Sequence, residues 1–186
     1  MEGAWRKKSK SLVSLSEQQL VDCVYEESRD GCDGGSTSTA IQWAIDNPQY
    51  GMASEAAYSY RGDGDGSCHH HYGTVARFTG MVRVERDSED DLKDAVGNVG
   101  PVAVAIDADH HSFMHYDSGV FTEDHCSSSH LDHAVTVIGY GHEDGKDFWL
   151  VKNSWGDDWG EDGYIKMQRN YNNMCGIAHS AKYAVA

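Results

Sequence analysis

Two polar residues beside apolar segments, His133 and Asn153, have the types and the spacing to act as a proton-transfer pair. An imidazole changes its charge near neutral pH, so it can take a proton from a nucleophile and later return it to a leaving group. An asparagine amide oxygen can accept a hydrogen bond from one ring nitrogen and leave the other facing the nucleophile. Trp155 could shield this bond from water and so strengthen it. The pair therefore predicts the base and the orienting group of a nucleophilic catalytic site.

Strands in the second half of the chain would position this pair. Beyond Pro101 the sequence changes to β-rich runs bounded by Gly or Asp, at 102–106, 133–138, 148–151 and 164–167. His133 begins one run and Asn153 follows another, so adjacent strands are expected to present both side chains at one edge of a sheet.

The first half favours short helices. Ser16 and Gln19 match a capping box, which predicts a helix that carries Leu20 and Val21 inward. Ser36 can cap a second helix, because an apolar stripe with helical period follows it, and residues 88–96 form a third such pattern. A helical half followed by a β half predicts two lobes, with a boundary near residue 80.

Composition and charge exclude several function classes. The 186 residues are 39% hydrophobic, as in a folded globular protein, and contain no apolar run of membrane-spanning length. A net charge of −15 argues against a nucleic-acid partner. Protonation of all eleven histidines would bring that charge to −4, so self-repulsion falls as the medium becomes acidic. This favours a lysosomal, vacuolar or digestive setting, although an acidic surface can equally serve solubility alone.

Four stretches, in this order, resemble the motifs of the papain and cathepsin L family. They are Ser14-Leu-Ser-Glu-Gln-Gln-Leu-Val-Asp-Cys23, Gly31-Cys-Asp-Gly-Gly35, Leu131-Asp-His-Ala-Val135 and Lys152-Asn-Ser-Trp-Gly-Asp-Asp-Trp-Gly-Glu-Asp-Gly-Tyr164. The resemblance covers essentially the whole chain. It implies that His133 is the catalytic imidazole, Asn153 its orienter and Trp155 the aromatic shield.

The resemblance also implies substrate-binding residues. These are Gly34, Gly35, Thr37, Ala105, Leu131, Asp132 and Ser180. Gly35 is expected to hydrogen-bond the substrate residue two before the cut, although a tight turn before a helix explains both glycines equally well. Thr37 and Ser180 are small and polar where cathepsin L relatives often have apolar residues, which argues against a strong preference for bulky aromatic side chains.

The family's nucleophile is a cysteine about 130–150 residues before the histidine. Counting back from His133 reaches from position 3 to about 17 residues before Met1, and residues 1–3 are Met, Glu and Gly. The nucleophile, and the glutamine of the oxyanion hole, are therefore expected upstream. Residues 2–8 are interpreted as the later part of the central helix that would carry this cysteine.

The five cysteines are an odd number, so disulfide pairing within the chain leaves at least one of them without a partner cysteine. By resemblance, Cys23 pairs with Cys68 and Cys126 with Cys175. Cys32 would pair with a cysteine of the upstream segment, so it is expected to be free. A substitute nucleophile at Cys32 is disfavoured, because family geometry places it away from His133.

A metal site at Cys68-His69-His70-His71 is also disfavoured, because consecutive histidines on a loop rarely converge on one ion. We expect no metal and no cofactor.

The sequence thus predicts an α+β papain-like fold, N-terminally truncated. Its lobes are a helical left lobe over 1–80 and an antiparallel β-barrel-like right lobe over 81–186 that carries His133 and Asn153. The implied activity is cysteine-type endopeptidase, a hydrolase acting through a thioester acyl-enzyme, with this chain inactive by itself. Three interpretations stay open: a fragment of an ordinary thiol protease, the larger chain of a processed enzyme, or a non-catalytic relative that binds peptides or other proteins.

The implied partners are polypeptide substrates, a propeptide, a cystatin-type inhibitor or a missing N-terminal chain, without nucleic acid or membrane. The implied location is the lysosome or the extracellular space, reached through the secretory pathway.

Overall fold

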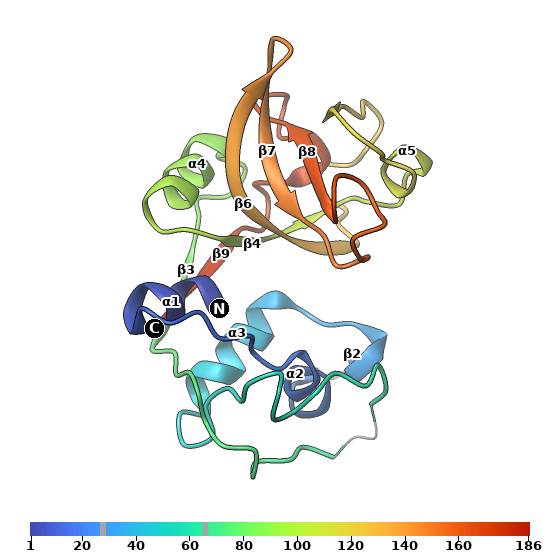
Figure 1. The fold of residues 1–186 in the computed structure, drawn as a ribbon. Coiled ribbons are helices and arrows are strands. Elements are labelled where there is room, and N and C mark those ends of the chain that lie inside the picture. Colours follow the sequence, from blue (N-terminus) through green and yellow to red (C-terminus); the bar gives the residue numbers. More distant parts are fainter. Residues whose placement is uncertain (27–28, 65–66) are drawn as a thin grey trace. The chain divides into compact units, whose positions relative to one another are not determined.

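A computed structural model describes residues 1–26, 29–64 and 67–186, which form two compact units. Unit 1 comprises residues 1–82 and 184–186, and unit 2 comprises residues 83–183. Helices predominate in unit 1 and strands in unit 2, so the class is α+β, as the sequence predicts (Figure 1). The sequence placed all of 81–186 in one lobe. The last three residues instead group with unit 1, where Thr79 N donates to Val185 O (2.7 Å) and Ala184 joins the core.

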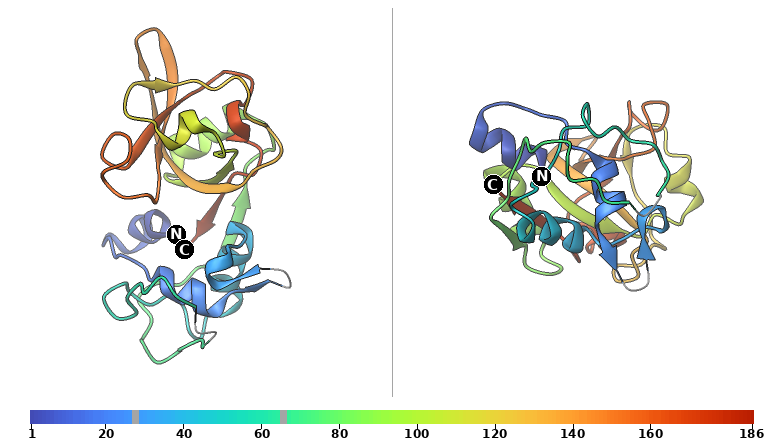
Figure 2. Two further views of the ribbon diagram at one scale, coloured as in Figure 1. Left: turned by 90° about the vertical axis from the view of Figure 1, so that its right-hand side faces the viewer. Right: turned by 90° about the horizontal axis from the view of Figure 1, so that it is seen from below.

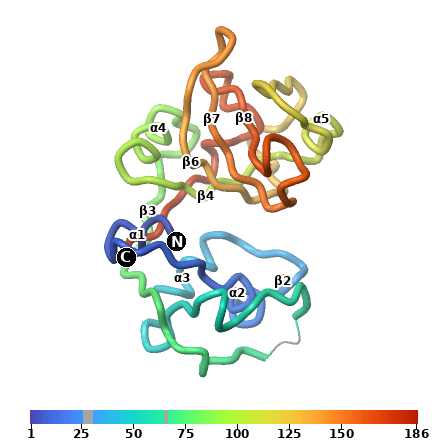
Figure 3. Tube along the Cα trace, in the orientation of Figure 1, coloured from blue at the N-terminus to red at the C-terminus, as the bar shows by residue number. Residues whose placement is uncertain are grey.

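Unit 1 is built on short helices around a small apolar core. Its elements are α1 (Glu2–Ser9), α2 (Glu17–Cys23), β1 (Tyr25–Glu26), β2 (Arg29–Asp30), the 3-10 turn η1 (Gly31–Asp33) and α3 (Thr37–Asp46). Residues 47–64 and 67–79 then follow an irregular path before β3 (Gly80–Arg83), as the Cα trace shows (Figure 3). Ile41 and Ala44 of α3 bury the expected apolar stripe against Met52 and Phe78.

Half of the expected capping box forms at α2. The Ser16 hydroxyl accepts from Gln19 N at 2.9 Å, which caps the helix. The Gln19 side chain does not return to Ser16. Its Nε2 donates to Gly51 O (3.0 Å), and its Oε1 accepts from Ala53 N (2.7 Å). The glutamine therefore fixes a distant loop to α2.

The buried face of α2 also differs from the prediction. Gln18, Gln19, Asp22 and Cys23 are buried, whereas Leu20 and Val21 are only half-buried. The cause is a polar network, because Asp22 accepts hydrogen bonds from Tyr58, Arg61 and Gln18. Buried polar groups are stable when they are paired in this way.

A seven-stranded sheet, in the order β3-β9-β4-β6-β7-β8-β5, forms the frame of the second half. Its remaining strands are β4 (Val102–Ile106), β5 (Val120–Phe121), β6 (His133–Glu143), β7 (Lys146–Lys152), β8 (Tyr164–Gln168) and β9 (Lys182–Val185). The pairs β4–β6, β6–β7 and β7–β8 are antiparallel, whereas β5 pairs with β8 in parallel. All four predicted strands are present, and β6 and β7 extend beyond the predicted ranges into a long hairpin.

The core of unit 2 lies where alternating strand residues meet two helices. In β4, Val102, Val104 and Ile106 are fully buried, as period-2 alternation requires. Helix α4 (Glu89–Asn98) adds Leu92 to this core, and the short α5 (His111–Met114) adds Phe113. These helices flank strands β6–β8 on opposite sides (Figures 1 and 2).

Two disulfides close long loops. Cys23 is bonded to Cys68, and Cys126 is bonded to Cys175. Cys32 is not in a disulfide and is exposed. Within the described ranges, no helix combines the length and the apolar character that crossing a membrane requires.

Candidate active site

The topology of β6 and β7 brings His133 and Asn153 to one edge of the sheet. His133 is the first residue of β6, and Asn153 directly follows the last residue of β7. The strands are antiparallel, with Thr136 opposite Lys152, so the start of one lies beside the end of the other. His133 Nε2 lies 2.8 Å from Asn153 Oδ1. The structure thus forms the hydrogen bond that the sequence suggested.

The backbone fixes the protonation pattern of this pair. Ser154 N, which can only donate, lies 2.8 Å from Asn153 Oδ1 and identifies that atom as the oxygen. Because the amide oxygen accepts, His133 Nε2 must be the nitrogen that carries the hydrogen. In the neutral ring, His133 Nδ1 is then the basic nitrogen. The ring is oriented to take a proton at Nδ1.

An aromatic cluster packs against the imidazole. The ring centroid of Trp155 lies 5.1 Å from that of His133, and 5.5 Å from that of Phe113. Phe113 is fully buried and also contacts Trp159, whose Nε1 donates to Met114 O (3.1 Å). Sequence reasoning missed Phe113 and Trp159 as supports of the site. The Trp-x-x-x-Trp spacing at 155–159 was the available signal.

Asp132, the residue before His133, is hydrogen-bonded to the backbone at the end of β4. Asp132 Oδ1 accepts from Ala108 N (2.9 Å), and Asp132 N donates to Ile106 O (3.0 Å). These bonds hold the segment before β6 against the end of β4, where Ile106 pairs with His133. Asp132 thereby sets the start of β6 and the position of the imidazole.

Asp107, the next residue along from Ile106, is held as a carboxylate. Burial alone would raise its pKa, but a hydrogen bond from Ser127 N and the neighbouring His110 lower that pKa below its ordinary value.

Comparison with known proteins settles the family. The profile described as "Papain family cysteine protease" matches residues 1–185. The chain belongs to the papain family of cysteine proteases. Curated relatives include "Cathepsin L" of Sarcophaga peregrina, 49% identical over 98% of this chain, and "Digestive cysteine proteinase 1" of Homarus americanus, 51% identical over 98% of it. The chain spans 54% and 56% of these relatives, so about half of their length.

Solved structures of the papain family share the fold. A digestive procathepsin L 3 from the larval midgut of Tenebrio molitor has a TM-score of 0.91 and 42% identity, covering 100% of this chain and 60% of its own. The bromelain protease of Ananas comosus in complex with the E64 inhibitor has a TM-score of 0.89 and 41% identity, covering 99% of this chain and 83% of its own. The α+β papain-like fold is confirmed.

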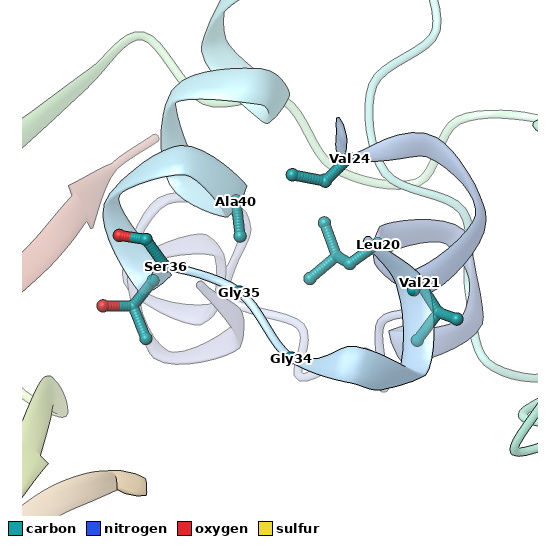
Figure 4. A pocket seen from close by; sticks show the side chains of 9 residues that line it. Leu20, Val21, Val24, Gly34, Gly35, Ser36 and Ala40 are labelled. Carbon is teal, nitrogen blue, oxygen red and sulfur yellow. The ribbon is translucent and has the colours of Figure 1, made fainter. Parts of the chain in front are cut away.

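The other residues expected to bind substrate fall in both units of this papain-family chain. In unit 1, Gly34, Gly35 and Thr37 line a pocket of about 240 Å³ between α2 and α3. Leu20, Val24 and Ala40 point into the same space (Figure 4). Gly34 has a φ of +97°, a backbone conformation that favours glycine. At Gly35 an added Cβ would meet no atom within 4 Å, so the described neighbours leave room for a side chain there.

In unit 2, three expected substrate residues lie in different segments: Ala105 in β4, Leu131 just before β6 and Ser180 in the turn before β9. Ala105 pairs with Ala134 across β4 and β6, one register position from His133. The Leu131 side chain packs against Gly176, where an added Cβ would come within 2.5 Å of Leu131 Cδ2. Ser180 accepts a hydrogen bond from Lys182 Nζ and lines a separate cavity.

Four of the five cysteines carry no free thiol. Cys23, Cys68, Cys126 and Cys175 form disulfides, and Cys32 lies in η1 of unit 1. Among the described residues, the one group with metal-ligand spacing is Cys23, Cys68 and His70. Its two sulfurs are bonded to each other, so they are not available as thiolate ligands.

Proposed function

We propose that this chain carries the imidazole and the orienting amide of a cathepsin L-like cysteine endopeptidase. The observation that carries the proposal is the hydrogen bond of 2.8 Å between His133 Nε2 and Asn153 Oδ1, with Ser154 N fixing the amide. This arrangement keeps His133 Nδ1 as the proton acceptor, which is the role that a thiol nucleophile requires.

The reaction follows from that geometry. His133 Nδ1 takes the proton of a cysteine thiol, and the thiolate attacks the carbonyl carbon of the peptide bond. The imidazolium then gives this proton to the leaving amine, and a thioester remains. The neutral ring next removes a proton from water, which hydrolyses the thioester. Asn153 holds the ring through both halves of the cycle.

The nucleophile is proposed to come from polypeptide outside these 186 residues. Four cysteines are oxidised and the fifth, Cys32, lies in a turn of unit 1. The same additional segment would supply the oxyanion-hole glutamine and a partner for Cys32, and it would complete the central helix to which α1 is proposed to belong.

The proposed substrates are polypeptides. We assign substrate contacts to Gly34, Gly35 and Thr37 in unit 1, and to Ala105, Leu131, Asp132 and Ser180 in unit 2. A propeptide is proposed as a partner, because one structural relative is a procathepsin. A cystatin-type inhibitor is a further proposed partner, and the proposed location is an acidic lysosomal or extracellular compartment.

The test compares the 186-residue chain with the protein isolated from its source. Both are treated with an epoxide thiol probe and a fluorogenic peptide. We expect labelling and hydrolysis by the isolated protein, with the label on a cysteine absent from this sequence, and neither reaction at a catalytic site of the 186-residue chain. Hydrolysis by the 186-residue chain that is abolished by His133→Ala would refute the proposal.

A non-catalytic, peptide-binding role is the second candidate. It is favoured by one observation, which is that four of the five cysteines are held in disulfides and only Cys32 keeps a thiol. Peptide binding by the source protein, without epoxide labelling at any cysteine, would support this role instead.

A further inference from the structure

Two histidines lie one helical turn apart on the outer face of α5. His111 begins this helix, and His115 directly follows its last residue, Met114. The backbone closes the turn, because His115 N donates to His111 O at 3.1 Å. Residues four apart on a helical turn share one face. Both histidines are exposed, whereas Phe113 between them is fully buried. Two imidazoles are therefore presented together to solvent.

The two imidazole rings are stacked on each other. Their centroids lie 4.0 Å apart, and their planes differ by 17°. A neutral imidazole offers one nitrogen lone pair, and two rings this close can direct both lone pairs at one ion. The adjustment that this requires is a rotation of the exposed His111 ring about χ2, which is a broad torsion for histidine.

The hydrogen bonding of His115 leaves its outer nitrogen as a ligand. Its Nδ1 lies 3.0 Å from His111 O. Since a carbonyl oxygen can only accept, Nδ1 carries the hydrogen, and in the neutral ring Nε2 keeps the lone pair. Metal-ligating histidines usually donate their other ring N–H to a carbonyl or carboxylate in this way, which fixes the tautomer and the orientation of the ring. None of the described residues hydrogen-bonds to Nε2 of His115 or to the His111 ring.

The electrostatic surroundings of α5 favour a cation. The Glu123 carboxylate accepts a hydrogen bond of 2.5 Å from Ser112 of the same helix. This bond, with one from His125 N, holds the pKa of Glu123 at about 2, so the carboxylate stays charged in mildly acidic medium. The net charge of the chain is −15. A dication is therefore attracted to this surface.

We propose that His111 and His115 form a surface site for a divalent transition-metal ion such as Zn²⁺, with water completing its coordination. Imidazole nitrogens suit such ions, whereas Mg²⁺ and Ca²⁺ require oxygen ligands. The lone pairs of His115 Nε2 and of one His111 ring nitrogen bind the ion. The inference goes beyond the proposed function and needs no thiol nucleophile.

This site differs from the two histidine groups that argue against a metal. In the run His69-His70-His71 the histidines are consecutive, and in the group of Cys23, Cys68 and His70 a disulfide removes the thiolates. Two histidines at positions i and i+4 on a helix are instead a recognised zinc-binding spacing. The expectation that the chain binds no metal therefore does not extend to α5.

An ion at α5 would act on the support of His133. Phe113, on the inner face of the same turn, lies with its ring centroid 5.5 Å from that of Trp155 and 6.3 Å from that of His133. An ion that links the two ends of the turn holds Phe113 in place. Binding should therefore stabilise the folded state of unit 2.

The test is a titration of the full chain with zinc chloride, followed by calorimetry and by NMR of the histidine ring protons. We expect the signals of His111 and His115 to shift together, as one ion binds to these two rings. Magnesium chloride at the same concentrations should leave both signals unchanged. Zinc should also raise the midpoint of thermal unfolding, because an ion that binds only the folded state stabilises it.

Substitutions assign the binding to α5. His111→Gln and His115→Gln each remove one ligand at an exposed position and should weaken zinc binding about a hundredfold, because a linked pair binds that much more tightly than one imidazole. His142→Gln is the matched control, at an exposed histidine with no other histidine three or four residues away, and should leave the affinity unchanged.

Three outcomes overturn the inference. The first is zinc binding that is unchanged in both α5 variants, which would place the ion elsewhere. The second is the absence of any zinc-dependent shift at His111 and His115. The third is an equal response to magnesium, which would reduce the effect to screening of the negative surface. Hydrolysis and epoxide labelling test the proposed function separately, and their result does not alter any of these outcomes.

Discussion

Asn153 orients the ring of His133 through a single oxygen, because Oδ1 lies 2.8 Å from both His133 Nε2 and Ser154 N. The other amide atom, Asn153 Nδ2, is buried and has no hydrogen-bond partner among the described residues. Substitution by aspartate would therefore sacrifice no hydrogen bond, while it places a negative charge next to the ring.

The first prediction follows from that relationship. Asn153→Asp should favour the imidazolium form of His133 relative to the unsubstituted protein, since an adjacent carboxylate stabilises a positive charge. The measurement is an NMR titration of the His133 ring protons. Asn172→Asp, at an exposed residue of unit 2, is the control and should leave this titration unchanged. An unchanged His133 titration in Asn153→Asp would mean that the two side chains are not in contact in solution.

A second prediction concerns the shielding by Trp155. Its ring lies next to that of His133 and is itself 42% exposed, so we expect it to cover the His133–Asn153 bond from water. Trp155→Ala should speed the exchange of the Nε2 hydrogen of His133 with solvent, and should reduce stability by only about 1 kcal/mol because the ring is half-exposed. Trp155→Phe should keep much of the protection. Equal exchange rates in all three proteins would remove the shielding role.

Gln19 gives a stability prediction in unit 1. Its side-chain amide is hydrogen-bonded to Gly51 O and Ala53 N, which belong to a loop more than thirty residues later in the sequence. Gln19→Ala should lower the free energy of unfolding by about 3 kcal/mol, because two backbone groups lose their partner in a buried site. The control is Gln42→Ala, at an exposed glutamine of α3 that bonds only Asp46 among the described contacts. Urea unfolding measures both, and similar losses in the two variants would show that Gln19 does not hold the loop.

Glu123 links stability to pH. A hydrogen bond from Ser112, followed by one from His125 N, lowers the pKa of Glu123 to about 2, from an ordinary 4.5. The folded state binds this proton more weakly than the unfolded state, so the stabilisation is full above pH 4.5 and is lost as pH falls toward 2. A protein of an acidic compartment would retain it at working pH.

Glu123→Gln removes this pH-dependent part. The stability difference between the native protein and Glu123→Gln should be largest above pH 4.5 and should shrink as the pH approaches 2. Unfolding by urea at several pH values measures it, with Glu85→Gln, at an exposed glutamate, as the control. A difference that stays constant over this range would contradict the assigned pKa.

The sequence predicted the edge arrangement of His133 and Asn153 because strand boundaries were visible as changes in residue type. It could not predict Phe113, since α5 has only four residues and is too short to show helical periodicity. The inward face of α2 was misjudged for a related reason. Apolar patterning favoured Leu20 and Val21, but Asp22 is held inward by Tyr58 and Arg61, which lie 36 and 39 residues later.

The position of Lys182 was hidden in the same way. A single lysine in the C-terminal segment gives no sign that its ammonium lies buried beside Ser180. Lys182 is paired with Ala103 across β9 and β4, and local patterns do not report pairings between residues so distant in the sequence.

His133 is proposed to activate a cysteine thiolate, and the pH dependence of thiol alkylation tests this role. In the protein isolated from its source, the rate of iodoacetamide modification is followed at each cysteine by mass spectrometry. We predict a cysteine outside this sequence that reacts at pH 5, because pairing with an imidazolium brings a thiol pKa to about 3–4. In His133→Ala this reactivity should move to the range of an ordinary thiol, about pH 8.5, while the rate at Cys32 is unchanged. Acid-range reactivity that survives His133→Ala, or that depends on His133 but is located at Cys32, would contradict this role of His133.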